Sequence, residues 1–199
     1  MAESLITKHA IADSLKELTR EKTFDKISVK DISEKCGINR QTFYYHFVDK
    51  FDLLEWIYKT DLFEPNMEGI DFDNWGEKFF QTLTAMKNDK YFYVNTINHT
   101  ENYIHRYIIE QTKVVFEKAI DILDEQRTVD EVQRDFIARF FAYGVAGMVI
   151  EWASDGMIKD PEFLSSNMMK LKNSCEKAAY IYISEENYEQ IPEELKNLH

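Results

Sequence analysis

The residues of this sequence best suited to bind a partner molecule lie in the stretch 40–47. Its two phenylalanines, Phe43 and Phe47, are four residues apart and would share one face of an α-helix. At about 100° per residue, Gln41 and Tyr45 point away from that face. The stretch therefore predicts a short helix with an aromatic back and a hydrogen-bonding front.

Both flanks of the same helix carry polar side chains, Arg40 and Tyr44 on one side and Thr42 and His46 on the other. A helix that docks in the major groove of DNA needs an apolar back, polar tips directed at base edges, and donors on both flanks for the phosphates. An ordinary surface helix that happens to be polar and aromatic would show the same spacing, so the pattern by itself leaves both interpretations open.

Lys50 favours the DNA interpretation. It falls at the start of the next predicted helix, where a cation opposes the positive end of the helix dipole. A phosphate bound there would remove the conflict, because helix N-termini bind anions through their N–H groups. The alternative, a solvated charge, would cost only about a few tenths of a kcal/mol.

Local signals place the stretch 40–47 on the second helix of a pair. Ser28 with Asp31 predicts a capped helix start, and Gly37 predicts the end of that helix. Asn39 is suited to cap the next helix. Two short helices joined across a glycine, over about residues 28–47, have the layout of a helix-turn-helix.

The rest of the chain also predicts helices, since only 6 glycines and 3 prolines interrupt 199 residues. One helix is expected before the pair, at about 7–21, and one after it, at about 49–63. The tract 64–71, which contains Pro65 and Gly69, is the best domain boundary. Five helices are then expected at about 74–88, 91–98, 101–126, 130–155 and 161–183.

These elements predict an all-α fold of about nine helices. A three-helix helix-turn-helix domain, residues 1–63, precedes a helical ligand-binding and dimerisation domain, residues 72–183. The polar, acidic residues 184–199 are expected to form a tail.

The net charge of −12 would by itself argue against a nucleic-acid partner. The distribution of charge removes that objection, because residues 1–50 carry 9 Lys and Arg against 8 Asp and Glu, and the other residues carry 15 against 28. Repulsion from the acidic part decays over about 10 Å at moderate salt. A DNA-binding domain attached to an acidic remainder is therefore compatible with the composition.

Patterns typical of enzymes are absent from the sequence: it has no glycine-rich phosphate loop, no nucleophile elbow and no HExxH. We predict that the chain is not an enzyme and uses no cofactor. Cys36 and Cys175 are far apart, and His99 and His105 lack metal-type partners at a suitable spacing, so neither a disulfide framework nor a metal site is expected. We also predict no signal peptide, no membrane-spanning segment and a cytoplasmic location.

Residues 6–60 resemble the DNA-binding domain of the tetracycline-repressor family. The resemblance is carried by the run SVKDISEKCGINRQTFYYHF at 28–47 and by the residues Asp49-Lys50 and Leu53-Leu54 that follow. It implies phosphate contacts by Thr42, Tyr44, His46 and Lys50, and base contacts by Arg40, Gln41 and Tyr45. Phe51 departs from the family pattern, which commonly has an acidic residue there. The stretch 147–162 is more loosely similar to the subgroup that includes the activator of dihydroxyacetone kinase genes.

Two long C-terminal helices carry apolar stripes that predict a homodimer. Small residues would let a neighbouring helix approach closely, and two such helices doubled by two-fold symmetry form a four-helix interface. The residues expected at this interface are Gly144, Gly147, Leu164, Leu171 and Ala178. In the alternative, both helices only complete the core of the monomer.

Aromatic residues are more abundant in the C-terminal part than a dimer interface needs, which suggests a pocket for a small organic effector. The candidates for its lining are Trp75, Phe79, Tyr93, Tyr103, Phe116, Met148 and Trp152. The alternative is that these side chains are plain core.

The sequence thus predicts a homodimeric, ligand-responsive repressor that binds a double-stranded DNA operator. One alternative is a co-regulator of the same fold that acts through a second regulatory protein. Another is a small-molecule-binding protein whose DNA-binding domain has degenerated.

Overall fold

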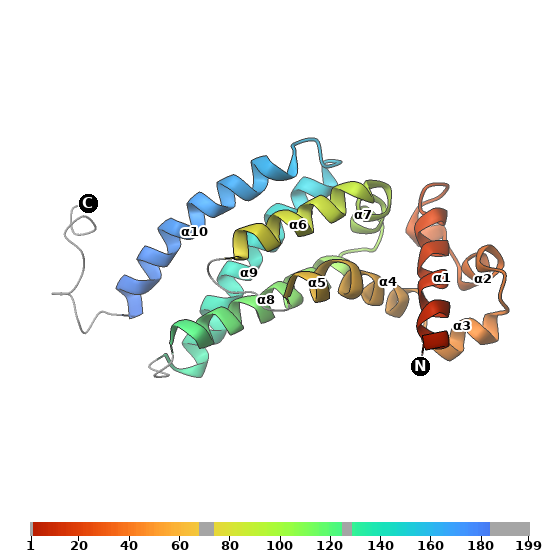
Figure 1. Cartoon of the computed structure of the whole chain (residues 1–199), viewed down its shortest axis with the longest axis horizontal. Coiled ribbons are helices and arrows are strands. Elements are labelled where there is room, and N and C mark those ends of the chain that lie inside the picture. The colour runs from red at the N-terminus through yellow and green to blue at the C-terminus, as the bar shows by residue number, and fades with distance from the viewer. Residues whose placement is uncertain (1, 68–73, 125–128, 184–199) are drawn as a thin grey trace.

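The computed structural model describes residues 2–67, 74–124 and 129–183, and within these ranges it contains helices and no strand (Figure 1). The all-α fold predicted from the sequence is confirmed. The helices, in chain order, are α1 (Ala2–Leu18), the 3₁₀ turn η1 (Phe24–Lys26), α2 (Val29–Cys36), α3 (Arg40–His46), α4 (Lys50–Tyr58), the π-helical segment η2 (Lys59–Phe63), α5 (Glu64–Met67), α6 (Trp75–Asn88), α7 (Lys90–Asn98), α8 (Tyr103–Leu123), α9 (Glu131–Ser154) and α10 (Pro161–Ile183). The predicted tail 184–199 lies outside the described residues.

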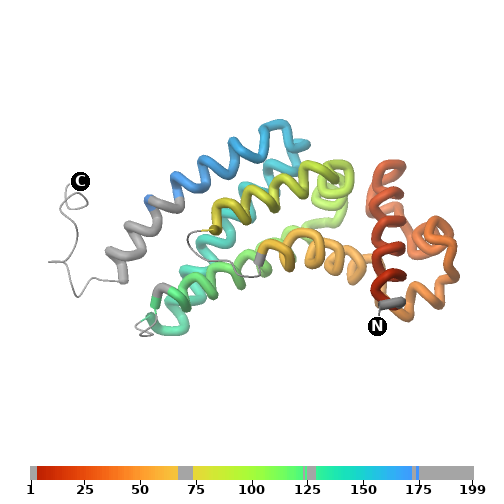
Figure 2. The backbone as a smooth tube through the Cα atoms, viewed as in Figure 1, coloured from red at the N-terminus to blue at the C-terminus, as the bar shows by residue number. Residues whose placement is uncertain are grey.

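The N-terminal helices α1, α2 and α3 form a small unit, called the head below, and α6 to α10 form the body (Figure 2). Helix α1 stands between the body and the pair α2–α3 (Figure 1). Its predicted apolar face is confirmed, since Ile11, Leu15 and Leu18 are all buried. The helix begins at Ala2 rather than at about residue 7. The sequence did not predict this earlier start, because residues 4–6 are exposed and add nothing to the apolar pattern.

The caps predicted for α2 and α3 are present. Ser28 and Asp31 form a complete capping box at the start of α2. Gly37 ends that helix with φ of 73°, in the left-handed region that favours glycine. The Asn39 side chain then accepts a hydrogen bond from the backbone N–H of Thr42 at 2.8 Å, which caps α3. These short-range bonds fix the angle between the two helices of the motif.

Helix α4 continues beyond the end expected at Phe63, through η2 and α5 to Met67. Pro65 does not end it. Proline lacks an N–H and crowds the turn before it, and the five residues that precede Glu64 adopt the wider π-helical geometry instead. The head is therefore joined to the body by one helical segment from Lys50 to Met67.

The body is a stack of helices in which α9 packs along α8 and α10 packs along α6. Ala138, Ala142 and Ala146 recur every four residues on the α9 face that meets α8, and all three are buried. Small side chains in this pattern allow close approach of the two helices. The buried residues of head and body form one continuous cluster, so the two units share a core.

Helix α9 is the one helix among the described residues that is long and apolar enough to cross a membrane, with a mean hydropathy of 1.3 over its most apolar stretch. The prediction that no segment meets this measure is therefore wrong. The reason is that α9 is apolar on two faces, one packed on α8 and one exposed. Its ion pairs with α8, such as Lys113 to Asp135 at 2.6 Å, place it in the helical body.

Candidate functional site

Helix α3 has the two-sided arrangement predicted for it. Phe43 and Phe47 are buried in the head, whereas Tyr45 is 82% and Tyr44 is 55% exposed. Arg40 is also exposed, at the first position of the helix. The Tyr45 ring contacts the His46 ring edge-on, with 5.0 Å between the ring centroids. The front of α3 is free to contact a partner.

The flanks of α3 differ in how free their side chains are. The hydroxyl of Thr42 donates to Asn39 Oδ1 at 3.1 Å, so a phosphate would compete with the cap for that proton. The Tyr44 ring packs edge-on against Phe43, with 5.6 Å between centroids, and its exposed hydroxyl has no such competitor. Gln41 is exposed on the front of the helix, and His46 is half-buried.

The sequence suggested that the ammonium of Lys50 would be unpaired at the start of α4. In the structure this ammonium has hydrogen-bond partners. It donates to the backbone carbonyls of Phe24 at 2.9 Å, Asp25 at 3.1 Å and Ile27 at 2.8 Å. It also lies 4.6 Å from the centre of the Phe24 ring. Burial lowers the pKa of this ammonium, although the nearby carboxylates, Asp25 first among them, oppose that shift. Contact with a phosphate stays a prediction, and one of these three bonds would have to break for it.

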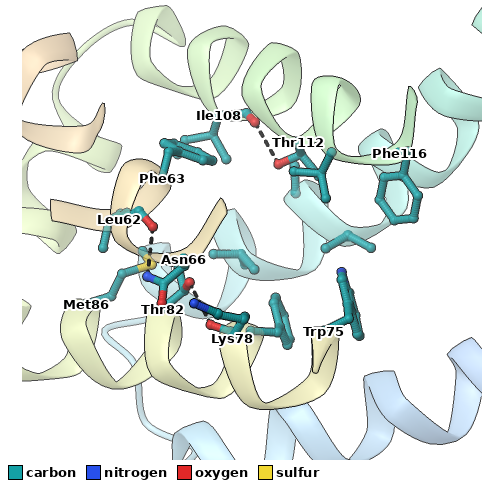
Figure 3. Close-up of a pocket in the computed structure, with 15 residues that line it drawn as sticks. Leu62, Phe63, Asn66, Trp75, Lys78, Thr82, Met86, Ile108, Thr112 and Phe116 are labelled. Carbon is teal, nitrogen blue, oxygen red and sulfur yellow. Dashed lines mark hydrogen bonds between the residues drawn. The ribbon is translucent and has the colours of Figure 1, made fainter. Parts of the chain in front are cut away.

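A cavity of about 90 Å³ opens between α6, α8 and α9, close to the end of the connecting segment (Figure 3). A water needs roughly 10–15 Å³ on this measure, so the cavity has room for a small molecule. Its walls are almost entirely apolar. The few polar side chains are mostly occupied, since Asn66, Thr82 and Thr112 each donate to a carbonyl of their own helical segment.

Three of the seven predicted pocket residues line this cavity: Trp75, Phe79 and Phe116. The rings of Trp75 and Phe79 are stacked 5.2 Å apart and form one wall. Sequence reasoning missed the other residues of the lining, because α-helical spacing alone does not tell which helix faces which. These residues are Leu62, Phe63, Asn66, Lys78, Thr82, Met86, Ile108, Thr112, Val115, Val145, Ala146 and Val149.

Two of the other predicted pocket residues belong to the core instead. Tyr93 is buried and packs edge-on against Tyr58, with 5.2 Å between ring centroids. Trp152 is also buried, and its indole N–H donates to the carbonyl of Lys159 at 2.8 Å. Neither side chain lines the cavity, and both are buried, as the plain-core alternative predicts.

The remaining two predicted pocket residues face other parts of the molecule. The Tyr103 hydroxyl donates to Glu55 at 2.5 Å, and this bond raises the pKa of Tyr103 to about 12. Its ring packs on Phe51 at 4.7 Å, so Tyr103 ties α8 to α4. Met148 is exposed on the outer face of α9.

That outer face of α9 is apolar and exposed. Phe136 and Phe140 are 69% and 67% exposed, and Tyr143 lies beside them. Gly144 and Gly147 follow, and a Cβ added at either position would meet no atom within 4 Å. We call these five residues the α9 outer face.

The two α10 residues of the predicted dimer interface whose side chains the structure describes differ in burial. Leu164 is only 5% exposed and packs into the core of the monomer, so it is unavailable to a second chain. Leu171 is 57% exposed and remains available. The side chain of Ala178 lies outside the described part of the structure.

An ion-pair cluster connects the head to the body. Lys16 of α1 contacts Asp61 of η2 at 2.6 Å and Asp89, between α6 and α7, at 3.4 Å. Burial acts to lower the pKa of Lys16, but the hydrogen bond and charge of Asp61, helped by Asp89, outweigh it and raise the pKa. Among the described residues, no group of three or more His, Cys, Asp or Glu is placed to hold a metal ion.

A helix-turn-helix head with an exposed hydrogen-bonding helix, carried on a helical body with an apolar cavity, defines a class of bacterial transcription regulators. The chain belongs to the tetR family of bacterial regulatory proteins. The model of that family matches residues 11–57, and a model described as a transcriptional regulator C-terminal region matches residues 73–174. The chain is therefore a DNA-binding transcription regulator.

Two curated proteins are similar in sequence. The dhaKLM operon transcriptional activator DhaS of Lactococcus lactis is 28% identical over 157 residues, which cover 76% of this chain and 81% of that protein. The uncharacterised regulator YxbF of Bacillus subtilis is 21% identical over 175 residues, which cover 81% of this chain and 43% of that longer protein.

Solved structures show the same fold. The dihydroxyacetone kinase operon activator DhaS superposes with a TM-score of 0.64 at 26% identity, over 84% of this chain and 94% of that one. NalD, the secondary repressor of the MexAB-OprM multidrug efflux pump in Pseudomonas aeruginosa, superposes with a TM-score of 0.59 at 17% identity, over 84% of this chain and 94% of that one.

The contacts of Lys50 predict that it stabilises the head. Lys50→Met should lower the free energy of unfolding by about 2–4 kcal/mol, because three carbonyls lose their donor. Lys30→Met is the matched control, since Lys30 is exposed and forms an ion pair with Glu34 at 3.7 Å on the surface of α2, and it should change stability by less than about 0.5 kcal/mol. Urea denaturation followed by circular dichroism measures both variants. Equal stability of the two variants would contradict a structural role for Lys50.

Proposed function

We propose that the protein is a homodimeric, effector-responsive repressor that acts in the cytoplasm and recognises its operator with the front of α3. The observation that carries this proposal is the two-sided α3, whose Phe43 and Phe47 are buried while Tyr45 is almost fully exposed. A recognition helix in the major groove contacts base edges with its exposed side chains, and the back of the helix anchors it to the domain.

The geometry supports separate roles for the front and the flanks of α3. The proposed base-contacting residues are Arg40, Gln41 and Tyr45. All three are exposed, and within the described part of the chain no hydrogen bond holds their side chains to the rest of the head. The proposed phosphate contacts, made by the flanks, come from Thr42, Tyr44 and His46. For Lys50, the three carbonyl bonds favour a structural role over the phosphate contact predicted from the sequence.

The α9 outer face supports a two-fold dimer with antiparallel α9 helices. Its bulky side chains come first along the chain and its glycines last. With the symmetry axis between positions 143 and 144, Tyr143 would face the partner's Gly144, and Phe140 would face the partner's Gly147. A two-fold interface has to be complementary to itself, and this register places a large residue opposite an open space on both sides of the axis. A parallel pairing would place phenylalanine on phenylalanine and glycine on glycine.

The cavity supports regulation by a small molecule of mainly apolar character. Its aromatic wall and its occupied polar groups leave little capacity to bind a strongly polar ligand. Helix α6 contributes to the lining and ends just before Asp89, which forms the ion pair with Lys16 of the head. A ligand that shifts α6 would therefore act directly on the contact between body and head.

A second candidate function is supported by the likeness to DhaS, which is named as an activator. In that case this protein would activate transcription, or act through a second regulatory protein. Transcription in vitro with the purified protein and its operator separates these functions. A repressor lowers the transcript level by itself, an activator raises it by itself, and a co-regulator has no effect until its partner is added.

Selection of bound sequences from random DNA tests the proposed DNA contacts. We expect a palindromic operator with half-sites about 34–36 Å apart or a multiple of that distance. Tyr45→Ala should relax base preference at particular positions by about 1–3 kcal/mol. Tyr44→Phe, the neighbouring flank variant, should weaken binding to all sequences alike by about 1 kcal/mol. If Tyr45→Ala selected the same operator with the same stringency, the assignment of base contacts would be wrong.

Sedimentation velocity tests the proposed dimer. Gly147→Leu should yield monomers, because a leucine would fill the space proposed for Phe140 of the partner subunit. The control is Gln81→Leu, which introduces the same side chain at an exposed position of α6 and should sediment as the wild type. Phe140→Ala should also weaken the dimer, by about 3 kcal/mol or more if the ring is fully covered. A Gly147→Leu variant that sediments as the wild type would exclude this register.

Thermal-shift screening against apolar metabolites, with tryptophan fluorescence as a second signal, tests the effector. A ligand present at about 100 times its dissociation constant should stabilise the protein by about 2.7 kcal/mol. Thr82→Trp should abolish that shift by filling the cavity, while Gln81→Trp, exposed on the same helix, should retain it. Failure of every compound, together with copurification of a second regulator, would favour the co-regulator.

A further inference from the structure

One side chain of the body makes three hydrogen bonds to the backbone of the head. Asn95, on α7, accepts from the N–H of Phe24 at 2.8 Å through its Oδ1. Its Nδ2 donates to the carbonyls of Thr19 at 2.7 Å and Lys22 at 3.0 Å. All three backbone groups lie in the segment 19–27, which connects α1 to α2 and is more than 70 residues away in the sequence.

The chemistry of these contacts requires an amide side chain. The carbonyls that follow the end of α1 have no further helical turn to supply their donors, and the Phe24 N–H stands at the start of a separate 3₁₀ turn. A primary amide offers two donors and one acceptor on a planar group, which matches this set. A carboxylate would place an oxygen against the two carbonyl oxygens, and an alanine would leave all three groups without this partner.

The segment that Asn95 holds is in turn bonded to α2 and to the start of α4. The Lys22 ammonium pairs with Asp31 at 2.9 Å, and Asp31 completes the capping box of α2. The Ser28 hydroxyl and the Lys22 ammonium hold the pKa of this carboxyl well below its ordinary value. The carbonyl of Phe24 accepts from Lys50 at the start of α4, directly after α3. Phe24 is thus held through its N–H by the body and through its carbonyl by the start of the connecting segment.

A second connection between head and body acts at a different point of α1. Lys16 pairs with Asp61 and Asp89 before the end of the helix, whereas Asn95 acts just after it. The shared core and the connecting segment already limit movement between head and body, and a single polar contact would add only a point about which the head can turn. Two connections at successive points along α1 restrict that rotation.

We infer that Asn95 is a positioning residue that sets the orientation of the head on the body. In a dimer, the orientation of each head determines the separation of the two α3 helices and hence the half-site spacing of the operator. The inference rests on the proposed dimeric DNA binding. Asn95 would determine which half-site spacing the dimer prefers, and it would not affect which bases are preferred within a half-site.

The test compares operators that carry none, one or two extra base pairs between the half-sites. Each base pair moves a half-site by about 3.4 Å along the DNA. Wild-type affinity should fall about ten-fold or more with one added base pair, whereas Asn95→Ala and Asn95→Asp should reduce that discrimination to about three-fold or less. Base preference within each half-site should not change. Asn98→Asp makes the same chemical change about one turn further along α7, where the side chain donates to the carbonyl of Ser154 in the body at 3.3 Å, and should keep the wild-type spacing.

Several results would overturn the inference. These are an unchanged spacing preference in both Asn95 variants, a wild type without any spacing preference, or a uniform loss of affinity at all spacings by folded variants. Hydrogen exchange of the free protein gives an independent readout that needs no DNA. Amides of residues 19–27 should exchange about ten-fold faster in Asn95→Ala than in the wild type, and Asn98→Asp should leave them unchanged. A protein that binds no palindromic DNA would contradict the proposed function, while unchanged exchange would contradict the role of Asn95.

Discussion

Residues 19–27 leave the regular helical pattern while part of the segment packs into the core, so many of their backbone polar groups need partners from side chains. Lys50 supplies donors to three carbonyls, and Asn95 pairs with two further carbonyls and one N–H. One of these residues belongs to the helix after α3 and the other to the body. The hydrogen bonds that pair this short stretch of non-helical backbone therefore join the recognition motif, the connecting helix and the body into one unit.

Much of the fold could be predicted because its signals are local. The capping box at Ser28, the left-handed glycine at Gly37 and the cap at Asn39 each involve residues a few positions apart, and all three are present in the structure. The predicted end of the fourth helix at about Phe63 was wrong for a reason that lies outside local rules. Pro65 usually predicts an interruption, but buried Leu62 keeps the helical segment packed on the body and the chain accommodates the proline with a wider turn.

Only the part of the candidate site that lies on a single helix could be predicted from the sequence. The four-residue spacing of Phe43 and Phe47 was enough to predict which side of α3 is exposed. The cavity was not, because its lining comes from three helices and from the connecting segment, and apolar spacing does not show which neighbour each residue faces. Leu164 illustrates the same limit: an apolar side chain on α10 fits a dimer interface or the monomer core equally well until α6 and α9 are in place.

The uneven charge of the chain affects how such a regulator searches a genome. Affinity for arbitrary DNA grows with the number of phosphates that a protein neutralises, because each contact releases condensed counterions. The first 50 residues have nearly balanced charge, and the acidic remainder adds no attraction. We expect weak binding to non-operator DNA and short residence on it. Such a protein would locate its operator mainly through repeated encounters from solution, with little sliding along the duplex.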